Sequence, residues 1–235
     1  MEKKMKKCYI VGAGDFYGSI EPCEEDIVIA ADGGLVHLER MGIAPDVIAG
    51  DFDSLDSLAR LSRYLTAKDL TRVKNSEKES IKTEYLGKEL EIVRCPVMKD
   101  ETDMRLAYRI GASRGYTNFE LYGGVGGRED HTFANYCLLL EAKNDKNDAV
   151  LVGKDTKVFI VKNEEKRIFG REGATVSVFA FGKEALGVSI RGLKYGAENI
   201  TLKPSFPLGV SNSFSESGEG VISVTDGALL VMIYG

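Results

Sequence analysis

The sequence has 235 residues, of which 43% are hydrophobic and 29% charged, close to the averages of globular proteins, so it is neither a disordered chain nor a fibrous repeat. The formal net charge of −5 argues against nonspecific nucleic-acid binding, which needs a basic surface that displaces counterions. The first apolar stretch ends at Gly12, too short for a signal peptide or a membrane span, so we expect no membrane partner and a cytoplasmic location.

The four cysteines support an intracellular protein. Cys8, Cys23, Cys95 and Cys137 are scattered, with no CxxC spacing and no cluster of histidines beside them. Disulfide scaffolds are short and rich in cysteine, so we predict free thiols that serve as small apolar residues of the core.

The chain opens with a predicted strand at residues 8–11 that leads into a glycine turn, Gly12 to Asp15. A dinucleotide fingerprint needs a third glycine and a helix directly after such a turn, whereas Phe16 and Tyr17 follow here. The GxG spacing alone is therefore weak evidence, and we do not predict a nicotinamide site.

A second strand, predicted at residues 27–31, precedes Asp32, Gly33 and Gly34, and a helix is predicted at residues 35–41. Asp32 lies where this helix is expected to begin. Its carboxylate has two interpretations that the sequence leaves open, a helix N-cap or a ligand-binding group.

A third strand, predicted at residues 47–49, leads directly to Asp51 and Asp53. Two residues apart in an extended segment, these carboxylates leave the chain on the same side, where they can share one hard cation. Mg²⁺ prefers oxygen ligands and keeps part of its shell for substrate phosphates. The pattern thus predicts metal-dependent phosphate chemistry.

Residues 66–89 are polar, lack clear periodicity and are predicted to be a surface segment with room for one short helix. A strand is predicted at residues 90–93. After it, Asp100 and Asp103 flank Thr102, a candidate N-cap for a helix that runs to about Ser113. Both carboxylates have a simple alternative explanation, since anionic side chains stabilise a helix N-terminus.

A glycine-rich loop follows the strand predicted at residues 119–122. It places four glycines before Arg128, Asp130 and His131, so its backbone donors and the Arg128 guanidinium are suited to phosphate oxygens. The following helix, predicted at residues 132–143, carries an apolar face that we expect to pack in the core, consisting of Phe133, Tyr136, Cys137 and Leu140.

These elements predict an α/β N-terminal domain with a mostly parallel sheet, residues 1–147, followed by an all-β antiparallel sandwich, residues 148–235. In a parallel sheet the loops after the strands share one edge, so acidic residues far apart in sequence can converge there. Six strands are predicted in the second domain, at residues 158–161, 175–179, 188–190, 209–211, 221–224 and 229–233.

Taken in chain order, the motifs resemble the thiamine pyrophosphokinase family. Each is weak alone, but their number and order over almost the whole chain make the resemblance specific. The motifs are Ala31 to Gly34, Gly42-Ile43 with Pro45-Asp46, Gly50 to Ser54, Lys99-Asp100 with Thr102-Asp103, Gly123 to His131, Gly192 to Tyr195 and Gly209 to Asn212.

The resemblance implies transfer of the pyrophosphoryl group of ATP to the hydroxyl of thiamine, with Mg²⁺, in a homodimer that binds thiamine at the subunit interface. The implied metal ligands are Asp51, Asp53 and Asp100, which with Arg128 and Asp130 form the catalytic group. The implied nucleotide-binding residues are Asp32, Gly33, Asp103, Gly126, Gly127, Arg128 and His131. The implied thiamine contacts are Tyr195, Ser211 and Asn212.

The chain departs from the family pattern because it has no tryptophan to lie against thiamine, so Tyr195 or Phe214 is expected to substitute. Residues 66–89 also look longer than the usual link between the two acidic motifs. Two alternatives remain, a pyrophosphokinase for another alcohol such as a hydroxymethylpterin, and a catalytically silent nucleotide or thiamine sensor. The Gly192 and Gly209 motifs argue against the first. The presence of all five acidic candidates, Asp32, Asp51, Asp53, Asp100 and Asp130, argues against the second.

Overall fold

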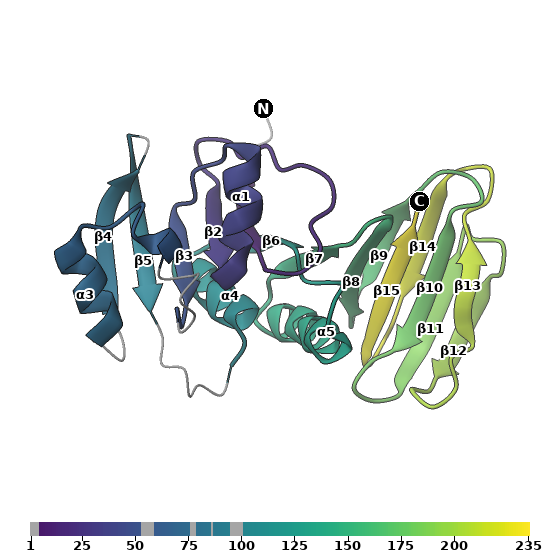
Figure 1. Ribbon diagram of the computed structural model, residues 1–235. Helices are drawn as coiled ribbons and strands as arrows, with labels where there is room; N and C mark the ends of the chain where they lie inside the picture. Colours follow the sequence, from purple (N-terminus) through teal and green to yellow (C-terminus); the bar gives the residue numbers. More distant parts are fainter. Residues whose placement is uncertain (1–4, 53–58, 76–78, 86, 95–100) are drawn as a thin grey trace. The chain divides into compact units, whose positions relative to one another are not determined.

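The computed structural model describes residues 5–52, 59–75, 79–85, 87–94 and 101–235 (Figure 1). The chain divides into two compact units, Met1–Asn135 and Tyr136–Gly235. The helix α5 (Glu129–Asn144) carries the chain from the first unit into the second. The domain boundary expected at residue 147 stays a prediction.

The first unit alternates strands and helices, as predicted. Its other elements are β1 (Lys7–Val11), β2 (Ile27–Ala31), the 3-10 turn η1 (Asp32–Gly34), α1 (Leu35–Met41), β3 (Val47–Gly50), α3 (Ala67–Asn75), β4 (Glu79–Tyr85), β5 (Lys88–Arg94), α4 (Asp103–Ser113) and β6 (Asn118–Tyr122). None of the helices in the described ranges is long and apolar enough to cross a membrane.

The strands of this unit follow the order β6-β1-β2-β3-β5-β4. All neighbours are parallel except the edge strand β4, which runs antiparallel to β5. The carboxyl ends of β1, β2, β3, β5 and β6 therefore lie at one edge of the sheet. The strand order reverses between β1 and β6, and in open α/β sheets ligands bind in the crevice at such a reversal.

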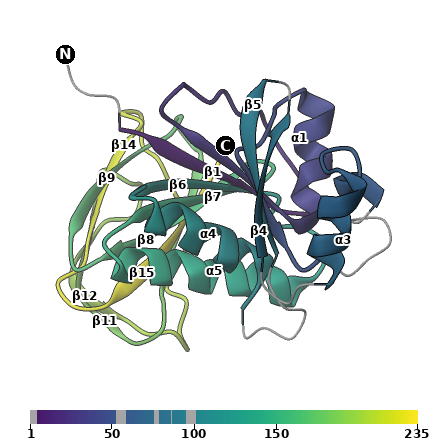
Figure 2. The same cartoon turned by 90° about the vertical axis from the view of Figure 1, so that its left-hand side faces the viewer.

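The buried strands have the sequences that a parallel sheet covered on both faces requires. β2 (IVIAA) and β3 (VIAG) are apolar and buried throughout, without polar alternation. α1 and α4 lie on opposite faces of the sheet and supply that cover (Figure 2). α1 ends at Gly42, whose left-handed φ of 68° lets the Gly42 and Ile43 N–H groups bond back to Glu39 and Leu38.

Two expectations for the first unit differ from the structure. Residues 66–89 contain a short helix, α3, as the sequence allowed, but they also contain the strand β4, which was not predicted. A polar edge strand has only one buried face and therefore gives a weak apolar signal. The buried face of α5 consists of Asn135, Leu138, Leu139 and Ala142, whereas Phe133 and Cys137 are exposed.

The cysteine prediction is correct only in part. Cys8 is buried in β1, whereas Cys23 and Cys137 are exposed, and Cys95 lies outside the described residues. Burial raises the pKa of the Cys8 thiol, so this side chain stays neutral and packs as an apolar group.

The second unit is an antiparallel sandwich, as predicted, with three more strands than the sequence indicated. One sheet has the order β13-β10-β15-β8-β7 and the other β12-β11-β14-β9. The strands are β7 (Asp148–Val152), β8 (Thr156–Lys162), β9 (Glu165–Phe169), β10 (Thr175–Ala180), β11 (Ala185–Arg191), β12 (Ala197–Leu202), β13 (Gly209–Ser213), β14 (Glu219–Ser223) and β15 (Ala228–Tyr234).

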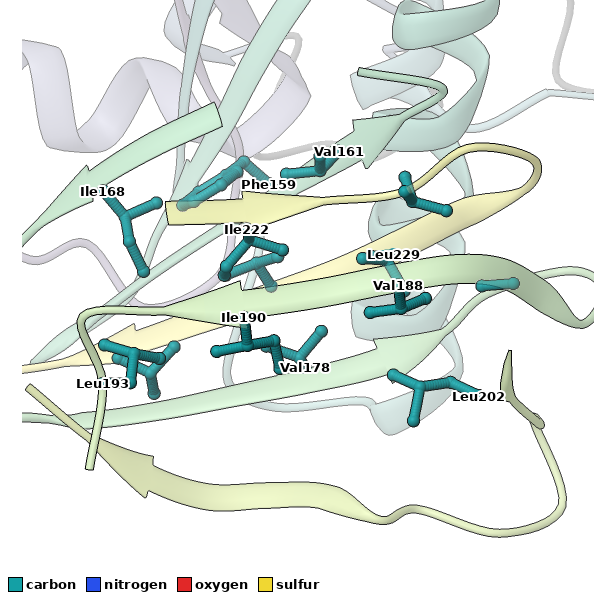
Figure 3. Packing of buried hydrophobic residues seen from close by; sticks show 14 of the residues in the cluster. Phe159, Val161, Ile168, Val178, Val188, Ile190, Leu193, Leu202, Ile222 and Leu229 are labelled. Carbon is teal, nitrogen blue, oxygen red and sulfur yellow. The ribbon is translucent and has the colours of Figure 1, made fainter. Parts of the chain in front are cut away.

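The sandwich core is built from apolar side chains of both sheets, as Figure 3 shows. Val178 from β10, Val188 from β11 and Ile222 from β14 are each fully buried. Phe214 also belongs to this core and is 2% exposed. The expectation that Phe214 substitutes for a tryptophan beside thiamine is therefore wrong, since its ring is used to fill the core.

We expect Ile222→Ala to destabilise the protein, because it removes a fully buried side chain and leaves a cavity between the sheets. Large-to-small changes of this kind cost roughly 2–5 kcal/mol. Urea unfolding followed by circular dichroism measures the loss. Leu186→Ala, at a β11 position that is 44% exposed, is the control and should change stability by less than about 0.5 kcal/mol. Equal losses in the two variants would contradict this description of the core.

Candidate functional site

A cavity of about 470 Å³ lies in the first unit, at the edge of the sheet where the parallel strands end. Its walls come from the segments that follow β1, β2 and β6 and from the N-terminal parts of α4 and α5. The lining residues are Gly12, Ala13, Gly14, Ala31, Asp32, Glu101, Thr102, Asp103, Met104, Gly123, Gly124, Gly126, Gly127, Arg128, His131 and Asn135.

Two glycine-containing loops form one wall and are joined by backbone hydrogen bonds. Gly12 N–H donates to Tyr122 O at 2.8 Å, Gly14 N–H donates to Gly123 O at 2.8 Å, and Asp15 N–H donates to Val125 O at 3.0 Å. The first bond belongs to the end of the parallel pair of β1 and β6, and beyond it Asp15 and Val125 form an isolated antiparallel bridge. The cavity wall is thus part of the sheet's hydrogen-bond network.

The glycines permit this close approach. A Cβ atom on Gly123 would lie 2.2 Å from the Gly12 carbonyl oxygen, and one on Gly14 would lie 2.6 Å from the Val125 carbonyl oxygen. A Cβ atom on Gly126 would lie 2.3 Å from the Asp15 carboxylate. Gly123 and Gly126 also have left-handed φ angles of 62° and 82°, a backbone conformation that is unfavourable for residues with a Cβ atom. The sequence pattern here has a steric cause.

Asp32 lies on the cavity wall and does not cap a helix. The N-cap positions of η1 and α1 are Ala31 and Gly34, and at neither position does a side chain accept a hydrogen bond from the helix N–H groups. Asp32 also has φ of 44°, a left-handed conformation that is costly for a residue with a Cβ atom. Of its two interpretations, the structure excludes capping of these helices.

The third strand ends beside Asp32. A Cβ atom on Gly50 would lie 3.4 Å from Asp32 Cα, so the segments after β2 and β3 are in contact. Asp51 follows Gly50 and is half-buried, and its carbonyl oxygen accepts a bond from Arg94 Nε at 3.2 Å. Asp51 is adjacent to the cavity rather than among its lining residues.

The predicted cap of α4 is confirmed. Thr102 Oγ1 accepts a hydrogen bond from Arg105 N–H at 3.3 Å, and the helix runs from Asp103 to Ser113 as expected. Asp103 lies in its first turn and lines the cavity. Glu101, which the sequence analysis did not select, also lines the cavity and is paired with Arg105 and Arg109 at 3.2 Å each.

Arg128 and Asp130 form a bidentate ion pair at the start of α5. Arg128 Nε donates to Asp130 Oδ1 at 3.1 Å, and an Arg128 terminal nitrogen donates to Oδ2 at 2.6 Å. These bonds are the main cause of the lowered pKa of the Asp130 carboxyl, to which His131 N–H also contributes. The same pair raises the pKa of Arg128, which therefore stays charged.

The predicted nucleotide-binding residues converge well. Asp32, Asp103, Gly126, Gly127, Arg128 and His131 all line the cavity, although they come from segments about a hundred residues apart. Gly33 does not line it, but its position is next to Ala13, which does. Asp130 is not among the lining residues, but its carboxylate is paired with Arg128, which lines the cavity.

Of the predicted metal ligands, Asp53 and Asp100 lie outside the described residues. Among the residues that are described, no three His, Cys, Asp or Glu side chains are grouped so that they could hold a metal ion. The carboxylates of Asp32 and Asp103 are the acidic groups of the cavity besides Glu101.

The predicted thiamine-binding residues lie together in the second unit. Asn212 is 6% exposed, and its Oδ1 accepts bonds from Tyr195 N–H at 3.0 Å and Ser213 N–H at 2.9 Å. Its Nδ2 donates to Tyr195 O at 2.7 Å. Asn212 thus holds the Tyr195 backbone, while the Tyr195 ring is 62% exposed, with Lys194 Nζ 5.5 Å from its centroid.

Sequence reasoning missed Asn135, which is 4% exposed and lines the cavity. Its position carried a signal, since it begins the i, i+3, i+4, i+7 pattern completed by Leu138, Leu139 and Ala142. It also lies one helical turn after His131, on the same face. A polar residue at the head of an apolar helix face is a candidate for a specific hydrogen bond.

Comparison with known families shows the family to which the chain belongs. The family model described as the catalytic domain of thiamin pyrophosphokinase matches residues 23–151, more than half of the chain. The chain belongs to the thiamin pyrophosphokinase family. The model described as the vitamin B1 binding domain of thiamin pyrophosphokinase matches residues 157–229, so the match extends over the sandwich.

Relatives of this family resemble the chain along its length. A thiamine pyrophosphokinase of Bacillus subtilis (strain 168) is 25% identical over 217 residues, covering 89% of this chain and 87% of that protein. Family membership makes the chain an enzyme, a kinase of thiamine diphosphate biosynthesis, and ATP is the family's co-substrate.

Solved structures of the family share the fold. The Bacillus subtilis thiamine pyrophosphokinase has a TM-score of 0.73 at 21% identity, covering 97% of this chain and 98% of that one. A thiamin pyrophosphokinase family protein of Enterococcus faecalis has a TM-score of 0.74 at 21% identity, with coverage of 97% and 99%. For the Candida albicans enzyme the values are 0.68 and 16%, with coverage of 99% and 90%.

We expect Arg128→Gln to return the pKa of the Asp130 carboxyl towards its ordinary value of about 3.9. A carboxyl whose pKa is lowered by folding has its ion pair complete above that ordinary value, and the pair is lost as pH falls through the lowered pKa. NMR titration of the Asp130 carboxyl carbon measures the shift. Arg109→Gln is the control, since Arg109 pairs with Glu101 instead. An unchanged titration in Arg128→Gln would refute the pairing.

Proposed function

We propose that the chain transfers the pyrophosphoryl group of ATP to the hydroxyl of thiamine, giving thiamine diphosphate and AMP. The observation that most supports this is the cavity at the reversal of strand order, which combines a glycine loop, the cation of Arg128 and two aspartates. A polyphosphate needs hydrogen-bond donors and positive charge, and these two kinds of group lie on one wall. Family membership supplies the substrates.

In this reaction the thiamine hydroxyl oxygen attacks the β-phosphorus of ATP. A new oxygen–phosphorus bond forms, the bond between the β-phosphorus and the oxygen bridging to the α-phosphorus breaks, and AMP leaves with that oxygen. The hydroxyl proton is released. Catalysis of such a transfer depends mainly on holding the reactants in line and stabilising the phosphate charge.

We assign the residues of the cavity to the positioning of the phosphates. Arg128 holds phosphate oxygens, and Asp130 orients its guanidinium through the bidentate pair. Gly126 and Gly127, at exposed positions of the loop, let the backbone approach the phosphates. Asp32, Gly33, Asp103 and His131 complete the nucleotide-binding wall.

The donor set of the cavity fits Mg²⁺. Asp32, Glu101 and Asp103 supply carboxylates, and no thiol is among the described residues that line it. Mg²⁺ is commonly held by one or two carboxylates together with substrate phosphates. We propose that Asp51, Asp53 and Asp100 hold the metal, with Asp32 and Asp103 nearby. The ion would neutralise charge on the transferred phosphates.

For thiamine we propose contacts from the exposed Tyr195 ring and the Ser211 hydroxyl, with Asn212 bonding to the pyrimidine or fixing Tyr195 beside it. An aromatic face attracts a cation such as the thiazolium ring. The site is proposed to lie at the subunit interface of a homodimer, and the cytoplasmic location stays a prediction from the cysteine pattern.

Neither alternative gains support from the comparisons. A pyrophosphokinase for a hydroxymethylpterin would not explain the match of residues 157–229 to a vitamin B1 binding domain. A silent sensor would be expected to have lost acidic groups, and all five candidates are present in the sequence.

Purified protein with ATP, Mg²⁺ and thiamine should form AMP and thiamine diphosphate in equal amounts, measured by liquid chromatography. Removal of divalent metal with EDTA should abolish turnover, and added Mg²⁺ should restore it, because the acidic groups alone repel the polyphosphate. A reaction without thiamine is the control. ADP as the coproduct, or AMP formation independent of thiamine, would disprove the proposal.

Gly126→Ala should raise the KM for ATP more than Gly127→Ala does. Both glycines have left-handed φ, 82° and 70°, but only at Gly126 would the new Cβ atom meet a neighbour, the Asp15 carboxylate. The backbone strain of about 1 kcal/mol is common to both, so the difference isolates the packing of the loop. Steady-state kinetics with varied ATP measures it. Equal KM values in the two variants would argue against tight loop packing.

A further inference from the structure

Asn135 contacts the middle of the glycine loop. Its Nδ2 donates to the Gly124 carbonyl oxygen at 2.7 Å, and the side chain is almost fully buried while lining the cavity. A buried carbonyl that loses its only donor carries the full desolvation cost, so this bond strongly constrains the Gly124 peptide.

Three successive carbonyls of the loop are held in this way. Gly123 O accepts from Gly14 N–H, Gly124 O accepts from Asn135, and Val125 O accepts from Asp15 N–H. The two outer bonds come from the backbone of the loop after β1, and the middle one comes from a side chain. Asn135 therefore supplies the donor for the one carbonyl of the three that receives no backbone hydrogen bond.

Fixing a carbonyl also fixes the N–H group across the same peptide bond. A trans peptide is planar and its C=O and N–H point in opposite directions, and the described chain has no cis peptide. Carbonyls held by the protein at residues 123–125 thus turn the N–H groups of Gly124, Val125 and Gly126 the other way. Val125 forms an isolated antiparallel bridge with Asp15, whereas within the described ranges the N–H groups of Gly124 and Gly126 donate to no backbone acceptor.

We propose that Asn135 is a positioning residue for polyphosphate binding, which acts by holding the Gly124 peptide in place, and with it the glycine loop whose Gly124 and Gly126 N–H groups meet the anion. Backbone N–H groups of a loop that are not bonded within the protein can bind an anion. The inference rests on the proposed function for the identity of the anion, a chain of phosphates. Asn135 affects binding through the orientation of the loop and not through the charge of Arg128.

The test compares Asn135→Leu with the wild-type protein. Leucine has a similar size but cannot donate, so the Gly124 carbonyl loses its partner. Binding of inorganic tripolyphosphate, measured by calorimetry, should weaken on the order of 10- to 100-fold, the effect of one unsatisfied buried group. The KM for ATP should rise by a similar factor, while the KM for thiamine changes less than about threefold.

Two further variants separate positioning from general stability. Asn135→Ala removes the donor without adding a charge, so it should weaken tripolyphosphate binding even if Asn135→Leu does not fold. Asn147→Leu removes another buried asparagine, 8% exposed and in the second unit, and should leave tripolyphosphate binding unchanged.

The inference would be overturned if a folded Asn135→Leu or Asn135→Ala variant bound tripolyphosphate as tightly as the wild-type protein does. It would also be overturned if the wild-type protein did not bind tripolyphosphate. An equal loss of thiamine and tripolyphosphate binding would also overturn it, because that result indicates a merely structural role. The proposed function fails separately, when wild-type protein forms no thiamine-dependent AMP while tripolyphosphate binding still depends on Asn135.

Discussion

The pairing of β1 with β6 determines where the site can form. Past the end of this parallel pair, backbone hydrogen bonds and an antiparallel bridge between Asp15 and Val125 join the loop after β1 to the loop after β6. Because strand order reverses at this pair, the helices that follow the neighbouring strands diverge and leave a crevice. The cavity is lined by the same two loops. A hydrogen-bond pattern of the sheet therefore decides the position of the phosphate-binding wall.

Ion pairs restrict the orientation of two charged side chains that line the cavity, Arg128 and Glu101. Arg128 is held by Asp130, and Glu101 by Arg105 and Arg109. Such pairs on partly exposed side chains add little to the stability of the fold, but they restrict the orientation of the groups that meet a ligand. In the second unit, hydrogen bonds have a similar effect. The buried Asn212 side chain holds the Tyr195 backbone in place, while the Tyr195 ring stays exposed.

Much of the architecture could be predicted from local patterns. The strands at residues 27–31 and 47–50 are continuous apolar runs, and Thr102 marks the start of α4 through its capping hydroxyl. The failures occurred where one side of an element is exposed. β4 is a polar edge strand, and α5 has exposed apolar side chains, Phe133 among them, that compete with its buried face in any periodicity argument.

The sequence by itself determined the fold class, the family resemblance and the choice of most site residues, because glycines and aspartates after apolar runs report local requirements of turns and strand ends. Tertiary structure decided what those residues do together. That Asp32 lines a cavity instead of capping a helix, and that Phe214 fills the core, depends on neighbours distant in sequence. The role of Asn135 is of the same kind, since its place at the head of an apolar helix face suggests a hydrogen bond but does not show that the Gly124 carbonyl is the partner.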